Sequence, residues 1–325
     1  MAVTWDLKPE DVARIRFAFS PMWELVASLR TLQDPSRQSI HLPWIKAVRP
    51  RLAGLDLDEL FALVPPSGYL ADFITPPPRT PLPDFAAELE QVRNTPPERA
   101  RTEAATIAGT IAGTDRALLD RFMADPAAGV ARVAAALETY WRACFEEFWP
   151  RVYGLLERDV LRRSRQLAQG GARELFAGLG PAVEWTGEQL LIDRPWCHAG
   201  GLHGDGLLLV PSAFYWPSVA VMSAPYQSML VYPVLGVGTL WEQGPPPAPG
   251  ALAALIGRSR AQILLALAEP STTSALAARM SLTPGAVSQH LGVLSDGGLA
   301  VGLRLGKQVV YRRTAAGDML AGASA

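Results

Sequence analysis

The residues best suited to contact another molecule lie between Thr283 and Leu294, near the C-terminus. On a helical wheel, Val287, Leu291 and Leu294 share one side. The opposite side carries Gly285, Ser288, Gln289 and Gly292, which are small or polar. A glutamine amide can bond N6 and N7 of adenine together, and small neighbours let the backbone approach a groove closely. The pattern predicts a helix that packs through one face and reads a base edge with Gln289 on the other.

Threonine followed by proline predicts where this helix begins. Thr283 would cap the helix and Pro284 would occupy its first turn. A helix N-terminus presents free backbone N–H groups and a partial positive charge, so it favours a nearby phosphate. We therefore count Thr283 among the residues expected to contact DNA.

Basic residues follow within a predicted hairpin. Two strand-like segments, 299–305 and 308–313, flank Gly306 and Lys307 and predict a wing. Arg304, Lys307, Arg312 and Arg313 would contact phosphates or the minor groove, which positions the protein without reading sequence. From Ala251 onward there are seven basic and three acidic residues, although the whole chain has a net charge of −1. A basic end on an acidic body fits phosphate binding.

The elements that position these residues form a recognisable order. A short helix is expected over 272–280, a turn at Ser281-Leu282, and the second helix from Thr283. Asp296-Gly297-Gly298-Leu299 then closes that helix before the hairpin. This order predicts a winged helix-turn-helix, which places its second helix in a DNA major groove.

The segment from Arg258 to about Thr314 resembles winged-helix repressors of the ArsR type. The likeness lies in Val287-Ser288-Gln289-His290-Leu291-Gly292-Val293-Leu294, then Gly298-Leu299 and the hairpin. It implies a homodimer that binds a two-fold-related operator and is often released by an inducer. Metal-sensing members carry Cys-x-Cys where this chain has Leu276-Ala277-Ala278, and others use acidic and His ligands in a final helix that has no His here. We therefore expect neither a metal nor a cofactor.

Composition indicates a well-buried protein with two separate cores. Of the 325 residues, 49% are apolar and 19% charged, and all nine Trp and ten Phe precede a proline-rich stretch at 245–250. We expect an N-terminal domain over 1–244, a linker over 245–250 and the DNA-binding domain over 251–325. The longest apolar run has about 13 residues, whereas a membrane span needs roughly 20. No secretory signal opens the sequence, so the expected location is the cytoplasm.

The N-terminal domain is predicted to be α+β, with helices followed by an antiparallel β region. Short strands are expected at 3–7 and 15–19, and Ser20-Pro21 opens a helix through about Leu32. Pro150 should break a long helical stretch over 127–169. Further helices are expected at 42–52, 83–93, 98–108 and 115–123, and strands at 183–185, 189–192, 206–210, 218–223 and 228–234. This part resembles the large uncharacterised domains fused to such modules in actinobacteria, through Ser20-Pro21-Met22-Trp23-Glu24-Leu25 and Leu209-Val210-Pro211-Ser212.

Aromatic residues suggest what this domain does. Trp23, Trp44, Trp141, Phe145 and Trp149 could line a cavity for a small apolar or aromatic effector, although ordinary core packing also explains them. Cys197, His198 and His203 could hold a metal, but their glycine-rich segment favours a hairpin loop.

Three functions remain open from the sequence. The favoured hypothesis is an effector-responsive DNA-binding regulator, a homodimer that acts as a repressor. The alternatives are an N-terminal enzyme or substrate-binding domain fused to a DNA-binding module, and a ligand-free architectural DNA binder. No phosphate-binding loop, dinucleotide fingerprint, nucleophile elbow or zinc-protease motif supports catalysis.

Overall fold

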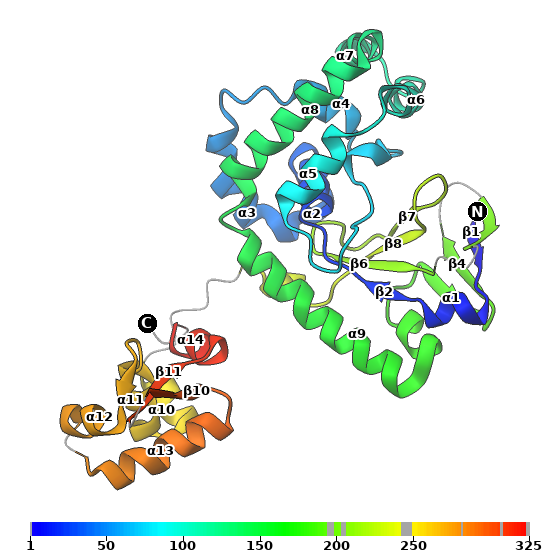
Figure 1. Ribbon diagram of the computed structural model, residues 1–325. Helices are drawn as coiled ribbons and strands as arrows, with labels where there is room; N and C mark the ends of the chain where they lie inside the picture. The colour runs from blue at the N-terminus through cyan, green and yellow to red at the C-terminus, as the bar shows by residue number, and fades with distance from the viewer. Residues whose placement is uncertain are drawn as a thin grey trace. The chain divides into compact units, whose positions relative to one another are not determined.

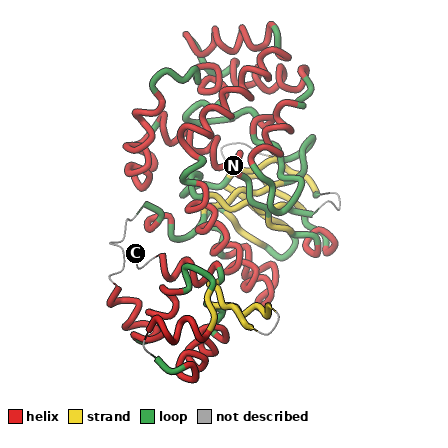
Figure 2. Tube along the Cα trace, turned by 60° about the vertical axis from the view of Figure 1, so that its left-hand side comes forward, coloured by secondary structure: helices red, strands yellow, loops and turns green. Residues whose placement is uncertain are grey.

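The computed structural model describes residues 2–193, 198–202, 206–241, 249–280, 282–305 and 308–322. The chain forms two compact units, 1–241 and 242–325. In the first unit, helices α2 (Pro21–Gln33) to α8 (Pro126–Tyr140) gather at one end and the strands at the other, while α9 (Trp149–Ala177) runs past both (Figures 1 and 2).

The helices of the first unit begin largely where local signals place them. Ser20 caps the second helix by accepting a hydrogen bond from Trp23 N at 2.9 Å, and Asp84 and Asp125 cap two later helices in the same way. The helices are α1 Pro9–Ala13, α2 Pro21–Gln33, α3 Leu42–Val48, α4 Asp58–Leu63, α5 Phe85–Arg93, α6 Pro97–Ala108, α7 Gly113–Ala124, α8 Pro126–Tyr140 and α9 Trp149–Ala177. Shorter 3-10 turns lie at Pro35–His41, Arg49–Leu52, Asp72–Ile74 and Val237–Thr239.

The long helical stretch is broken as predicted, with one addition. A π-helical turn at Trp141–Phe145 separates α8 from α9, and Pro150 lies in the first turn of α9. At Gly171 the backbone takes φ 65°, which ends the regular helix near the predicted position. The chain then resumes helical geometry to Ala177.

The strands form two four-stranded sheets of mixed direction. The first has the order β3-β4-β1-β5, from Val183–Trp185, Gln189–Asp193, Ala2–Asp6 and His198–Gly201. The second has the order β2-β6-β8-β7, from Arg16–Phe17, Leu208–Ser212, Met229–Pro233 and Ala220–Met222. The predicted antiparallel hairpin of β3 and β4 is confirmed. Pairs β1–β5, β2–β6 and β6–β8 are parallel, so the β region is not purely antiparallel. These pairs join segments that are far apart in the sequence, so local turn residues do not predict them.

Helix α2 is the centre of the first unit. Ten of its thirteen residues are buried, including Glu24 and Ser28, so this helix lacks the broad polar, solvent-facing side of an ordinary surface helix. Its neighbours include α5 and the 3-10 turn at 35–41. Polar groups on α2 must therefore find partners inside the protein.

The second unit is a winged helix-turn-helix, as predicted. Its helices are α10 Pro249–Ile256, α11 Arg258–Ala266, α12 Thr273–Met280, α13 Pro284–Asp296 and α14 Ala315–Gly322. Strands β10 (Ala300–Leu305) and β11 (Gln308–Arg313) form the wing, and β9 (Ser271–Thr272) pairs with β11. Val287, Leu291 and Leu294 are buried with Leu276 and Leu264 in one core. None of the helices within the described ranges is both long and apolar enough to span a membrane.

Candidate nucleic-acid interface and cleft

Helix α13 presents the face that the sequence predicts. Thr283 Oγ1 accepts a hydrogen bond from Ala286 N at 3.2 Å, so the helix is capped at that residue. Gly285, Ser288 and Gln289 are exposed, and His290 is half-buried beside the core. The first turn is exposed, but Pro284 has no N–H and the Ala286 N–H bonds the cap, so the Gly285 N–H is the group that would meet an anion there.

The outward face of α13 also carries two glycines, Gly285 and Gly292, and therefore has few side-chain atoms. A Cβ atom added to Gly285 or Gly292 would meet nothing within 4 Å, so no protein atom fills that space. The absence of side chains there leaves room for the edge of another molecule next to Gln289. This arrangement suits close approach of the helix backbone to a base pair.

The wing separates its cations onto different faces. Arg304 pairs with Val309 and Arg312 with Val301, so the two exposed arginines point to opposite sides of the hairpin. Arg313 forms an ion pair with Asp318 of α14, with Nε and Oδ1 3.1 Å apart. Lys307, predicted to contact DNA, lies outside the described residues. Among the described residues, Arg304 and Arg312 therefore do not belong to one patch on the hairpin.

Two protein-family models match different parts of the chain. One is described as a helix-turn-helix domain and matches residues 255–302. The other is described as a family of unknown function (DUF5937) and matches residues 96–238. No curated protein and no solved structure gives a significant match. The helix-turn-helix match, on a unit with a capped recognition helix and a wing, defines the chain as a DNA-binding transcription regulator.

The aromatic residues predicted for an effector cavity divide into two places. Trp141, Phe145 and Trp149 lie within 5.6 to 6.5 Å of one another between ring centroids, and Trp44 is 6.2 Å from Phe145. Trp44 and Phe145 are at most 1% exposed. These four rings fill the core together, whereas Trp23 belongs to a separate cluster.

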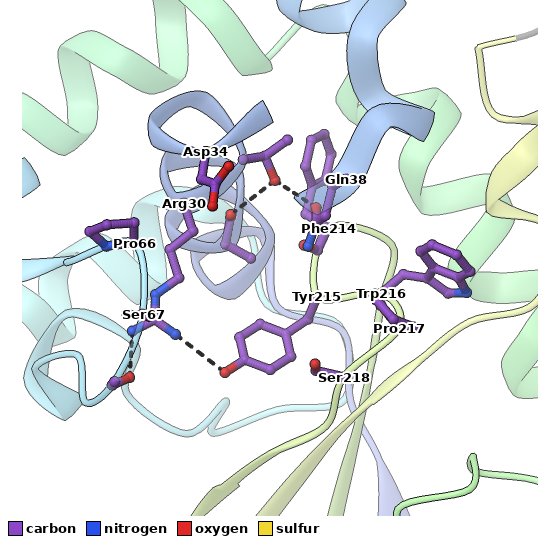
Figure 3. A pocket seen from close by; sticks show the side chains of 13 residues that line it. Arg30, Asp34, Gln38, Pro66, Ser67, Phe214, Tyr215, Trp216, Pro217 and Ser218 are labelled. Atoms are coloured by element: carbon purple, nitrogen blue, oxygen red, sulfur yellow. Dashed lines mark hydrogen bonds between the residues drawn. The ribbon is translucent and has the colours of Figure 1, made fainter. Parts of the chain in front are cut away.

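Trp23 instead packs beside Tyr215, which lines a cleft that the sequence did not predict. Its ring lies 5.8 Å from that of Tyr215, in the segment after β6. Beside Tyr215 is a cavity of about 540 Å³, within the usual range for small-molecule sites. Its lining includes Arg30, Asp34, Gln38, Ser67, Tyr215 and Trp216 (Figure 3).

Arg30 fastens the two sides of this cleft. Its Nε donates to Pro65 O at 2.9 Å and its Nη2 to Gly68 O at 2.7 Å, which holds the 65–68 loop against α2. Its Nη1 donates to Tyr215 Oη at 3.3 Å, a long contact (Figure 3). A second cavity of about 320 Å³ shares Arg30, Gly68 and Tyr215 with the first. The Arg30–Tyr215 contact therefore lies at the boundary between two cavities.

An acidic side chain marks the second cavity. Asp72 Oδ2 accepts a hydrogen bond from Tyr69 Oη at 2.9 Å. Burial raises the pKa of Asp72 to about 7, the hydrogen bond from Tyr69 opposes the rise, and the charge of Glu103 adds to it. The Asp72 carboxyl group is thus only partly ionised near neutral pH.

Glu24 positions the segment that carries Tyr215. Its carboxylate accepts hydrogen bonds from Ala213 N at 3.1 Å and Phe214 N at 3.2 Å. Complete burial raises the pKa of Glu24 to about 7, and the hydrogen bonds from Ser212, Phe214 and Ala213 oppose that rise. The wall of the cleft is therefore anchored to α2 through one buried carboxyl group.

His41 joins this wall to the end of the first unit. Its ring stacks on Phe214 with centroids 4.2 Å apart and planes at 10°. Trp241 Nε1 donates to His41 Nδ1 at 2.8 Å, so His41 Nε2 carries the proton and donates to Ala213 O at 3.2 Å. Burial lowers the pKa of His41 to about 4, against the effect of the bond to Ala213. The histidine is neutral and its tautomer is assigned by its partners.

Sequence reasoning missed Arg30, Glu24, His41 and Tyr215. One signal was present: a glutamate and an arginine in α2, whose other residues are mostly apolar or small. Cys197 and His203 lie outside the described residues, and His198 begins β5. Within the parts of the chain that the structure describes, no three potential metal ligands cluster.

Proposed function

We propose that this regulator is a cytoplasmic homodimeric repressor whose N-terminal unit senses a small apolar or aromatic effector. The observation that carries the DNA-binding part is the exposed face of α13, where Gln289 stands among residues with little or no side chain. These residues are not needed for the core of the second unit, so this face is free to enter a DNA major groove.

Base reading and positioning are assigned to different residues. Gln289 reads an adenine, with Ser288 and Gly285 beside it, and Thr283 with the first turn of α13 faces a phosphate. Arg304, Lys307, Arg312 and Arg313 contribute to phosphate or minor-groove contacts. Arg313 would do so only after its ion pair with Asp318 loosens.

Dimerisation supplies the second half-site. Two copies of α13 must enter successive major grooves, which lie about 34 Å apart on B-DNA. An effector that favours a different spacing would lower DNA affinity by shifting the population between two states. Repression and induction follow from that shift.

Fluorescence anisotropy tests the DNA-binding part of the proposal. The full chain is titrated against DNA from upstream of its own gene and against a scrambled duplex, over a range of salt. Sequence-dependent binding with a stoichiometry of two chains per site is expected. Gln289→Ala should lower affinity and Gln262→Ala should not, because Gln262 is equally exposed but lies on α11. Equal binding by both variants would contradict the role of Gln289 in base reading. A stoichiometry of one chain per site would contradict the dimer.

A further inference from the structure

The cleft between α2 and the segment 214–218 combines features of a ligand site. We propose that it binds an uncharged, flat aromatic molecule with polar substituents, and that Phe214, His41 and Trp241 link its occupancy to the C-terminal end of the first unit. The inference rests on the proposed effector response, for which it names the site and the ligand class.

Size and charge define the ligand class. A volume of about 540 Å³ holds a molecule of two or three fused rings. Its charged lining side chains are one cation, Arg30, and one anion, Asp34, while Thr31, Gln38, Ser67 and Ser218 offer neutral polar groups. An ion of either sign would be attracted to one of these side chains and repelled by the other, so its charge gains little in the cleft, while it loses far more hydration than a neutral polar molecule does.

Aromatic surface is available at the same place. Trp216 is 37% exposed and Tyr215 is half-buried, so both rings keep surface that a flat ligand can cover. Figure 3 shows Tyr215 between Arg30 and the chain leading to Trp216. Stacking on Tyr215 would bring a ligand against its long hydrogen bond with Arg30.

A continuous set of contacts runs from the cleft to Trp241. Gln38 accepts a hydrogen bond from Thr31 Oγ1 at 2.7 Å and donates to Phe214 O at 2.7 Å, so a cleft-lining amide holds Phe214. Phe214 stacks on His41, and His41 accepts the Trp241 indole N–H. Trp241 is the last residue of the first unit, directly before the segment that joins the two units. A ligand that shifts Gln38 or Phe214 therefore acts on the last residue of the first unit.

Binding is tested with three naphthalenes of one shape and different charge. 2-Naphthamide, 2-naphthoate and 2-(aminomethyl)naphthalene are titrated into the full chain by calorimetry. One amide molecule should bind per chain, about tenfold more tightly than either ion, because each ion loses its hydration while attraction to one charged side chain and repulsion from the other oppose each other. Ser67→Trp should abolish binding by filling the cleft at an exposed loop position, and Thr114→Trp, at an exposed position on α7, should not. Absence of amide binding, equal binding of all three, or binding by Ser67→Trp overturns the site.

Coupling is tested on the same protein with operator DNA. 2-Naphthamide should lower the DNA affinity of the wild type about fivefold or more. Trp241→Phe keeps a ring but removes the N–H that bonds His41, so it should still bind the amide while its DNA affinity stays constant. Trp185→Phe, in β3, is the matched control and should respond like the wild type. An unchanged response in Trp241→Phe, or no response in the wild type, overturns the link. Failure of the wild type to bind any DNA rejects the proposed function and leaves the calorimetric test of the site intact.

Discussion

Replacing Glu24 with glutamine should remove part of the pH dependence of the first unit's stability. Glu24 is fully buried, and burial raises its pKa to about 7 from an ordinary 4.5. Glutamine has nearly the same shape and cannot ionise. Its side-chain oxygen can still accept a hydrogen bond from Ala213 N or Phe214 N, so the wall of the cleft should stay in place.

The sign and size of the effect follow from proton linkage. A carboxyl group whose folded pKa is raised binds more protons in the folded state between the two pKa values. Its stabilisation is complete below pH 4.5 and is lost as the pH rises through 7. Between pH 5 and pH 8 the loss amounts to about 2–3 kcal/mol of the free energy of unfolding. Glu88 has its pKa raised to about 8 by burial and acts in the same direction, while His41 acts in the opposite one.

The measurement is the difference between wild type and variant, because the contributions of Glu88 and His41 then cancel. Urea unfolding is followed by tryptophan fluorescence, which reports only the first unit since all nine Trp lie within residues 5–241. The free energy of unfolding of the wild type minus that of Glu24→Gln should fall by about 2–3 kcal/mol from pH 5 to pH 8. Glu10→Gln, at an exposed position on α1, should give a flat difference. A flat difference for Glu24→Gln as well would refute the reasoning.

Four other changes have definite outcomes. Gln289→Ala should reduce discrimination at one base pair by about 1–3 kcal/mol, measured as anisotropy on single-substituted operators; undiminished discrimination would remove Gln289 from base reading. Lys307→Ala should weaken binding to all sequences alike and flatten the salt dependence by about one unit of slope, and a sequence-selective loss would contradict a phosphate contact. Gly129→Ala would place a Cβ 2.5 Å from Phe122 Cδ2, so urea unfolding should show a loss of about 1–3 kcal/mol. Leu291→Ala should cost the second unit about 2–5 kcal/mol, seen as faster hydrogen exchange of α13 amides, since Leu291 is fully buried; unchanged exchange would argue against its place in that core.

The recognition helix could be predicted from the sequence because its causes are local. The cap at Thr283, the proline after it and the spacing of Val287, Leu291 and Leu294 all lie within one helix. The hairpin of β10 and β11 is equally local, because the pair Leu305 and Gln308 is only three positions apart in the sequence. The helical spacing of the apolar residues therefore predicted that Gln289 is exposed. It did not by itself show that Gln289 contacts a base.

The cleft could not be predicted, because its parts meet only in the folded unit. Arg30 and Tyr215 are 185 positions apart in the sequence. Glu24 lies 189 positions from Ala213, whose backbone N–H donates a hydrogen bond to it. No periodicity connects such residues, and α2 resembles an ordinary apolar helix with a few polar substitutions. Four aromatic side chains that were predicted to line a cavity instead pack on one another: Trp44, Trp141, Phe145 and Trp149.

The sequence by itself determined the winged helix-turn-helix, its polar outward face and the break at Pro150, since each depends on hydrogen bonds and side-chain spacing within one or two turns of chain. Tertiary structure alone decided which strands run parallel, which carboxyl groups are buried and which side chains surround the cleft. Those outcomes depend on the removal of water from groups far apart in sequence, and the free energy of that removal is set only when the segments come together.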